Sequence, residues 1–151
     1  MIYLVDTNVL LRGIQQSHEM YQDARRAAAV LTRQGNQLSI TAQNLIEFWA
    51  VATRPVSSNG LALSLPETVA HLKTFKQTFT LLPDTADILS EWARLVVLHS
   101  VSGRQPHDAR LVAAMLVHNV AHILTFNADD FKRYDEITVI NPSSIKMISS
   151  E

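Results

Sequence analysis

Four carboxylates lie at positions from which they could share one pocket. Asp6 and Asp130 each follow a short apolar run that predicts a strand, and Glu47 is the one charged residue in a predicted helical stretch. Asp108 lies in the first turn of another predicted helix, just after a proline. Ligands of open α/β sheets bind beyond the carboxyl ends of the strands, so Asp6 is expected to project into such a crevice. Together the four acids predict one acidic pocket rather than four surface charges.

An acidic pocket of this kind needs a compensating positive charge. The sequence neighbours of Glu47 are mostly apolar, and desolvating a carboxylate among them is costly. Gathered carboxylates also raise one another's pKa values. A divalent cation offsets both effects, and ligation by Asp and Glu oxygens points to Mg²⁺ or Mn²⁺. Zinc is disfavoured because the chain has no cysteine and its 6 histidines lack zinc-type spacing.

The composition is typical of a globular domain. The chain has 151 residues, of which 47% are hydrophobic and 18% charged, and we expect one domain over residues 1–151. It has no cysteine, no apparent leader and no apolar stretch of membrane-spanning length, which favours a cytoplasmic protein without a membrane partner. The net charge is −1, but 13 Lys and Arg face ten carboxylates once the four pocket acids are set aside, a balance of +3. A mildly basic surface of this kind is compatible with nucleic-acid binding.

Short apolar runs alternate with longer helical patterns along the chain. This alternation predicts an α/β fold, a three-layer α/β/α sandwich around a short, mostly parallel central sheet. Strands are expected at residues 1–5, 38–40, 79–82, 122–125 and 137–140. Helices are expected from a Ser17 cap to Gly35, from a Thr41 cap to before Pro55, from Leu65 onward, from Pro83 toward His99, and from Pro106 to about Asn119. The stretch 56–64 is the longest irregular one and is expected to be a flexible flap.

Each carboxylate also has a purely structural explanation. Asp6 could accept hydrogen bonds from the amides of the next helix, although Asn8 could do so instead. Asp108 could be favoured by the helix dipole alone, and Glu47 could lie on an exposed helix edge. Asp130 lies with Asp129 in a polar turn, where acids are common. No single residue decides between the structural and the functional explanation. The order of the four carboxylates and the residues around them favour the functional one.

In that order and context, the sequence resembles the PIN-domain ribonucleases, especially the VapC-type toxins of bacterial toxin–antitoxin pairs. The resemblance covers essentially the whole chain. Its matching stretches are LVDTNVL at 4–10, QNLIEF at 43–48, PHDARLVA at 106–113 and LTFNADDF at 124–131. The first and third are the more specific. The resemblance implies a PIN-like fold in which Asp6, Glu47 and Asp108 form the acidic core that holds Mg²⁺ or Mn²⁺.

Members of this family vary at the fourth acidic position. Some carry an acid where Asn127 stands here, and others use the acid just before the Phe, which is Asp130 here. We predict Asp130 for this role, and Asp129 stays possible. Thr7 and Thr125 are expected as hydroxyl groups near the metal or the scissile phosphate, and Asn127 is a further supporting residue.

The activity that the resemblance implies is hydrolysis of RNA phosphodiester bonds, leaving a 5′-phosphate and a 3′-hydroxyl. Asp6 and Asp108 would be the principal ligands, and Glu47 and Asp130 would ligate through water or act as general base. The residues themselves do not select RNA over DNA. The family also implies a homodimer, and a small antitoxin protein whose C-terminal segment fills the acidic groove.

Two alternatives remain at this level, and the residues exclude a third. The chain could be a stand-alone PIN nuclease in RNA processing, or a metal-free interaction protein whose acids only cap helices. A phosphoacceptor signalling module also places an Asp at a strand end beside acids that bind Mg²⁺. That module needs paired acids after its first strand and a lysine after a later one, and neither is present.

Overall fold

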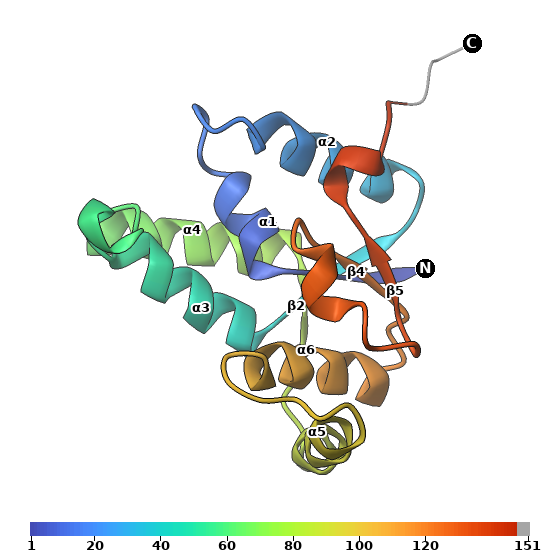
Figure 1. Ribbon diagram of the computed structural model, residues 1–151. Coiled ribbons are helices and arrows are strands. Elements are labelled where there is room, and N and C mark those ends of the chain that lie inside the picture. Colours follow the sequence, from blue (N-terminus) through green and yellow to red (C-terminus); the bar gives the residue numbers. More distant parts are fainter. Residues whose placement is uncertain (148–151) are drawn as a thin grey trace.

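A five-stranded parallel sheet forms the centre of the protein in a computed structural model that describes residues 1–147 (Figure 1). The strands are β1 (Ile2–Val5), β2 (Gln37–Thr41), β3 (Thr80–Leu82), β4 (His122–Leu124) and β5 (Thr138–Ile140). Their order across the sheet is β3-β2-β1-β4-β5, and every neighbouring pair is parallel. The central strand β1 therefore ends between β2 and β4, where ligands of parallel sheets bind.

Helices cover both faces of this sheet. One face carries α1 (Thr7–Arg12), α2 (Tyr21–Arg33), α3 (Ala42–Thr53) and α4 (Leu65–Thr78), and the other carries α5 (Ala86–Leu98) and α6 (Pro106–Val117). Three short 3₁₀ helices, η1 (Val56–Ser58), η2 (Ala128–Phe131) and η3 (Pro142–Ser144), lie between or after them. The predicted α/β/α sandwich with a parallel sheet is confirmed.

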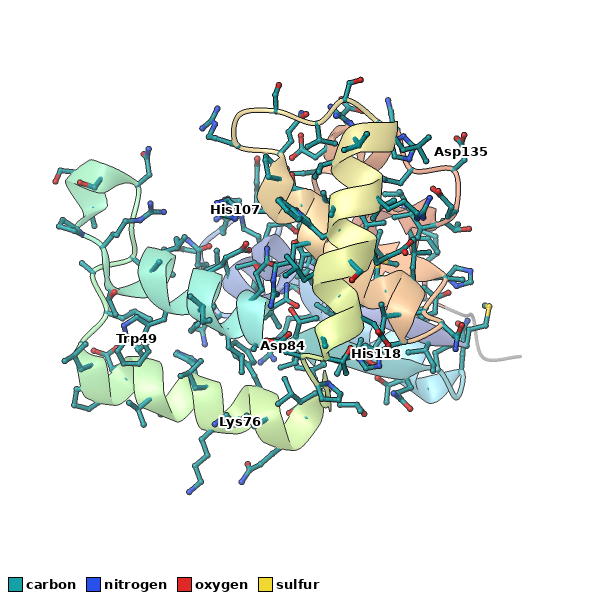
Figure 2. The ribbon with its side chains drawn as sticks, turned by 90° about the horizontal axis from the view of Figure 1, so that it is seen from below. Trp49, Lys76, Asp84, His107, His118 and Asp135 are labelled. Atoms are coloured by element: carbon teal, nitrogen blue, oxygen red, sulfur yellow. The ribbon has the colours of Figure 1, made fainter. Side chains whose placement is uncertain are left out.

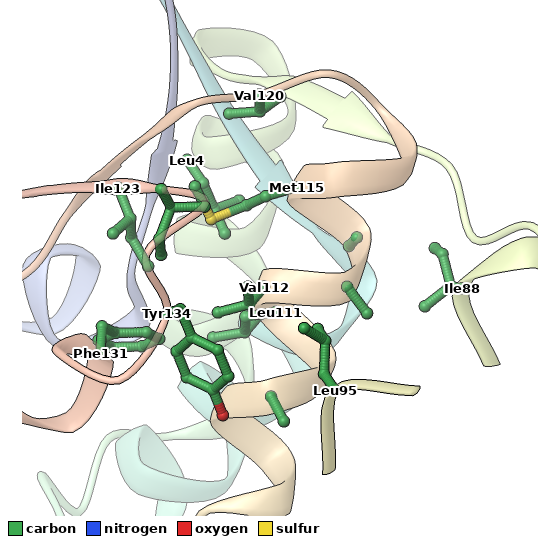
Figure 3. Packing of buried hydrophobic residues seen from close by; sticks show 14 of the residues in the cluster. Leu4, Ile88, Leu95, Leu111, Val112, Met115, Val120, Ile123, Phe131 and Tyr134 are labelled. Atoms are coloured by element: carbon green, nitrogen blue, oxygen red, sulfur yellow. The ribbon is translucent and has the colours of Figure 1, made fainter. Parts of the chain in front are cut away.

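The two apolar layers follow from the alternation of side chains along a strand. In β1, Leu4 packs into the core under α5 and α6, whereas Tyr3 and Val5 pack into the core under α1 to α4. In β4, Ile123 and Leu124 divide between the same two cores. Figure 3 shows the first of these cores, with Leu4 and Ile123 of the sheet facing Val112 and Met115 of α6, and Phe131 and Tyr134 beside them. Both faces of the sheet are covered at its centre, and the central strand β1 is accordingly a continuous apolar run.

The expected Ser17 cap is wrong. Helix α2 begins at Tyr21, and Met20 at its N-cap makes no side-chain hydrogen bond to the helix. A series of turns occupies the preceding segment, where His18 N donates to the Gln15 carbonyl and Tyr21 N to the His18 carbonyl. His18 Nδ1 accepts the Met20 N–H at 3.0 Å, so the histidine orders the turn that precedes the helix.

The stretch 56–64 is not an irregular flap. It begins with η1 and then runs back along the end of α3, where Leu61 N donates to the Val51 carbonyl at 3.1 Å and Leu63 N to the Ala52 carbonyl at 2.9 Å. Gly60 is buried there, and a Cβ at this position would lie 2.1 Å from the Arg54 carbonyl oxygen. Only glycine permits this close approach, so the segment is fixed against α3.

Within residues 1–147, none of the helices has the length and apolar character needed to cross a membrane.

Candidate active site

Asp6 is held at the carboxyl end of β1. Its main-chain N–H donates to the Leu124 carbonyl at 3.0 Å, which ties the residue to β4. One carboxylate oxygen accepts the Thr7 N–H at 2.8 Å, so Asp6 is the N-cap of α1, and the other accepts the Thr125 hydroxyl at 2.7 Å. Asp6 thus does cap the helix, and its second oxygen faces the neighbouring strand end.

The Asp6 carboxylate is costly to ionise in this position. Only 6% of the residue is exposed. Burial raises its pKa to about 6, although the hydrogen bonds from Thr125 and Thr7 lower it, and the charges of Glu47 and Asp130 raise it further. A cation beside Asp6 would reverse this effect.

Asn8 does not cap the helix but joins the ends of β1 and β4. Its Nδ2 donates to Thr125 Oγ1 at 3.1 Å and to Asp6 Oδ2 at 3.3 Å. Its Oδ1 accepts the Phe126 N–H at 3.2 Å. Thr125 Oγ1 in turn accepts the Asn127 N–H at 3.0 Å, so this hydroxyl orders the turn that leads to η2. The predicted supporting positions 125 and 127 therefore adjoin Asp6.

Glu47 enters the same region from α3. Thr41 caps that helix, as predicted, in a reciprocal pair of bonds with Asn44. Glu47 lies almost two turns later, with one oxygen accepting the Thr7 hydroxyl at 2.8 Å and the other accepting Gln43 Nε2 at 2.8 Å. The Glu47 carboxylate is half-buried, and a hydrogen bond holds each of its two oxygens. Glu47 is therefore not a solvated residue on an exposed helix edge.

Asp108 enters from the first turn of α6, two residues after Pro106. Desolvation raises its pKa to about 7; the charges of Asp6, Asp130 and Glu47 raise it further, while that of Arg133 lowers it. Among the described residues, no protein group donates a hydrogen bond to this carboxylate. Asp108 is therefore a partly buried anion that lacks the partners that Asp6 and Glu47 have.

All four predicted carboxylates line one cavity of about 560 Å³. Its walls also include Thr7, Asn8 and Asn127, and at its rim lie Arg54 and His107. Figure 2 shows His107 at the start of α6, on the side that faces α3. The cavity lies beyond the carboxyl ends of β1 and β4, where the sequence predicted an acidic pocket.

The three candidates for the fourth position differ in where they lie. Asp130 and Asn127 line the cavity, and Asp129 does not. Asp129 is 86% exposed at its side chain and pairs with Lys132 at 2.5 Å. Phe131 is buried, which anchors the short helix that carries Asp130. The geometry thus favours Asp130 over Asp129, while its role stays a prediction.

The donor set of this cavity fits a hard divalent cation. Carboxylate, hydroxyl and amide oxygens line its interior, and burial together with the neighbouring acids raises the pKa values of Asp6 and Asp108. In residues 1–147 no three acidic, His or Cys side chains converge closely enough to enclose an ion by themselves. Mg²⁺ usually retains several waters and takes one or two carboxylates, so an open arrangement of this kind suits it.

Gln43 and His107 lie in the matching stretches 43–48 and 106–113, but neither they nor Arg54 were predicted as members of the site. Gln43 lies one helical turn before Glu47, and side chains four residues apart on a helix are neighbours. That spacing was the one signal in the sequence. The contact of Gln43 with α6 depends on the tertiary structure alone.

Solved structures with this fold include several bacterial toxin–antitoxin proteins. VapBC2 from Rickettsia felis, bound to a DNA fragment from their promoter, matches with a TM-score of 0.70 and 18% identity, over 93% of this chain and 98% of that one. VapBC-1 from nontypeable Haemophilus influenzae matches with 0.72 and 14%, over 95% and 100%. VapC20 from Mycobacterium tuberculosis, described as a sarcin-ricin loop cleaving toxin, matches with 0.65 and 17%, over 87% and 95%. At these identities the likeness establishes the fold.

The sequence itself supplies the family. No curated protein matches it. The family profile described as the PIN domain matches residues 3–137, which include all four carboxylates of the cavity. The chain belongs to the PIN domain family, with the fold seen in VapC toxins.

Proposed function

We propose that this protein is a divalent-metal-dependent endoribonuclease and the toxin component of a type II toxin–antitoxin pair. The observation that carries the proposal is the convergence of Asp6, Glu47, Asp108 and Asp130 on one cavity beyond the strand ends. Membership in the PIN domain family and the fold of VapC toxins support it. We propose Mg²⁺ as the ion, with Mn²⁺ able to replace it.

The residues divide the chemistry between them. Asp6 and Asp108 would hold the cation, since both line the cavity and both have raised pKa values, which a positive charge would lower. When bound, the ion would supply Lewis-acid activation of water and neutralise charge on the phosphate. Glu47, which two hydrogen bonds orient, would ligate the ion through water and act as general base toward the attacking water. Asp130 completes the acidic wall and would orient water from the side of η2.

RNA binding would use the rim of the cavity. Arg54 and His107 lie there, on the α3 and α6 sides respectively, and would contact phosphates on either side of the scissile bond. The acidic interior repels an RNA backbone unless the metal is bound. Metal and substrate are therefore expected to bind cooperatively.

The partners proposed for this chain are a small antitoxin and a second copy of the chain. Several solved structures with this fold are complexes of toxin with antitoxin. A basic side chain of an antitoxin segment would lower the raised pKa values of Asp6 and Asp108, as a bound cation would. A short gene directly upstream that encodes such a segment would support this part of the proposal.

The test is cleavage of an end-labelled single-stranded RNA in Mg²⁺, with EDTA and a DNA of the same sequence as controls. Asp108→Asn should keep the fold and lose cleavage by orders of magnitude, because it removes a ligand charge. The matched control is Asp87→Asn, which changes an exposed acid in the first turn of α5. Full activity of folded Asp108→Asn, or activity that survives EDTA, would refute the proposal; a parent that binds a partner but cleaves nothing would favour an interaction protein.

A further inference from the structure

Gln43 is a buried polar side chain that bridges α3 and α6. Only 8% of it is exposed. Its Nε2 donates to Glu47 Oε1 at 2.8 Å and to the main-chain oxygen of His107 at 2.7 Å. Its Oε1 accepts Arg110 Nη1 at 3.1 Å. Two acceptors on one side and a cationic donor on the other leave a single orientation for this amide.

Arg110 is itself held from outside the cavity. Its Nη2 lies 3.2 Å from Asp84 Oδ2, in the turn between β3 and α5. On the inner side, the Thr7 hydroxyl donates to the second oxygen of Glu47. A continuous series of hydrogen bonds and one ion pair therefore runs from Asp84 through Arg110 and Gln43 to Glu47. Figure 2 labels Asp84, at the outer end of this series, and His107, whose carbonyl also accepts from Gln43.

Few other direct contacts join the two helices of the site, although both pack on the sheet. Within the described residues, α3 and α6 make little direct contact, because each packs mainly on other elements. Glu47 is on α3, and Asp108 directly follows His107 on α6. The bonds of Gln43 to Glu47 and to His107 thus connect one acid of the cavity with the backbone that carries another.

We propose that Gln43 is a positioning residue that sets the Glu47 carboxylate against the first turn of α6, with Arg110 and Asp84 keeping its amide in the required orientation. This inference rests on the proposed function, and it concerns how the acids of that site are held. Groups that orient metal ligands typically contribute about 10- to 100-fold to metal affinity or activity. The cost arises because a displaced carboxylate is no longer directed at the ion.

Two substitutions test the bridge. Gln43→Met keeps the length of the side chain and its helix propensity but removes all three bonds. Gln43→Glu keeps an acceptor for Arg110 but cannot donate to Glu47 or to the His107 carbonyl. Both should raise the Kd for Mn²⁺, measured by calorimetry without RNA, by about 10- to 100-fold. Both should lower kcat for RNA cleavage with KM unchanged.

Two controls separate positioning from general support of the fold. Gln77→Met makes the same replacement at an exposed site on α4 and should change nothing. Leu31→Val removes a methylene from the core under α2 and should lower stability without changing the Mn²⁺ Kd or kcat. If Gln43 were only structural, both of its variants would behave like Leu31→Val.

The possible results distinguish this inference from the proposed function. An unchanged Mn²⁺ Kd and kcat in folded Gln43→Met would overturn the positioning role while leaving the nuclease intact. A parent that binds Mn²⁺ but cleaves no RNA, with weaker Mn²⁺ binding in both Gln43 variants, would overturn the nuclease and support the positioning role. A raised KM with unchanged kcat and Kd would also overturn it, because the loss would then lie in substrate contact.

Discussion

Neutralising Asp6 should stabilise the metal-free protein at alkaline pH. Its pKa is about 6 in the folded chain against an ordinary value of 3.8. At 1.36 kcal/mol per pH unit, this difference makes the ionised form cost about 3 kcal/mol on folding. Because the folded pKa is the higher one, the cost is absent below the unfolded pKa and fully present above pH 6.

Asp6→Asn removes this cost while keeping the cap of α1. Its amide oxygen can still accept the Thr7 N–H, and asparagine is as good an N-cap as aspartate. Its NH₂ group would meet Asn8 Nδ2 and the Thr125 hydroxyl, both of which now donate to that carboxylate oxygen, and losing the two bonds costs about 2 kcal/mol. The net expectation is a gain of about 1 kcal/mol at pH 8 and a loss at pH 4, where only the cost of the lost bonds remains.

Urea unfolding followed by circular dichroism, in EDTA at pH 4, 6 and 8, measures this difference. Asp87→Asn is the control, since that exposed acid should give no gain at any of the three pH values. A stability difference for Asp6→Asn that does not change with pH, or a loss at pH 8, would refute the reasoning that Asp6 is a desolvated anion.

Three further results are expected. Asp130→Ala should weaken Mn²⁺ binding in a calorimetric titration without lowering stability in EDTA, while Asp129→Ala should leave the Kd unchanged; the reverse pattern would move the fourth role to Asp129. Gly60→Ala should lower the free energy of unfolding by about 2 kcal/mol or more, because its Cβ would lie 2.1 Å from the Arg54 carbonyl oxygen; an unchanged urea midpoint would show that the segment after η1 can shift freely. Mn²⁺ at 100 times its Kd should stabilise the parent by about 2.7 kcal/mol, read as a rise in Tm that EDTA abolishes; a Tm indifferent to Mn²⁺ would contradict binding to the folded state.

The sheet and most of the pocket could be predicted because their signals are local. The strand that ends at Val5 is an apolar run followed at once by a polar cap, and both features are visible in neighbouring residues. The same holds for Glu47, an isolated charge in an apolar helix, and for Asp108 after Pro106. The parallel order of strands then brings these positions to one edge.

The remaining features depend on contacts between distant segments. The sequence does not show that Gln43 reaches the carbonyl of His107, 64 positions away, because that bond requires α3 and α6 to be placed first. The stretch 56–64 has a loop composition, yet it is held by bonds to α3 that composition does not indicate. The choice between Asp129 and Asp130 depends on which of two adjacent side chains faces the cavity, and Lys132 pairs with the one that does not.

The central claim is that the acidic cavity binds a divalent cation through Asp6 and Asp108. Calorimetric titration of Mn²⁺ into the metal-free parent and into an Asp6→Asn/Asp108→Asn double variant tests it most directly, with circular dichroism to show that both are folded. We predict saturable binding to the parent and a Kd at least about 100-fold higher in the double variant, because two ligand charges are lost. Equal Mn²⁺ affinity in the two proteins, or no binding to the parent, would contradict the claim.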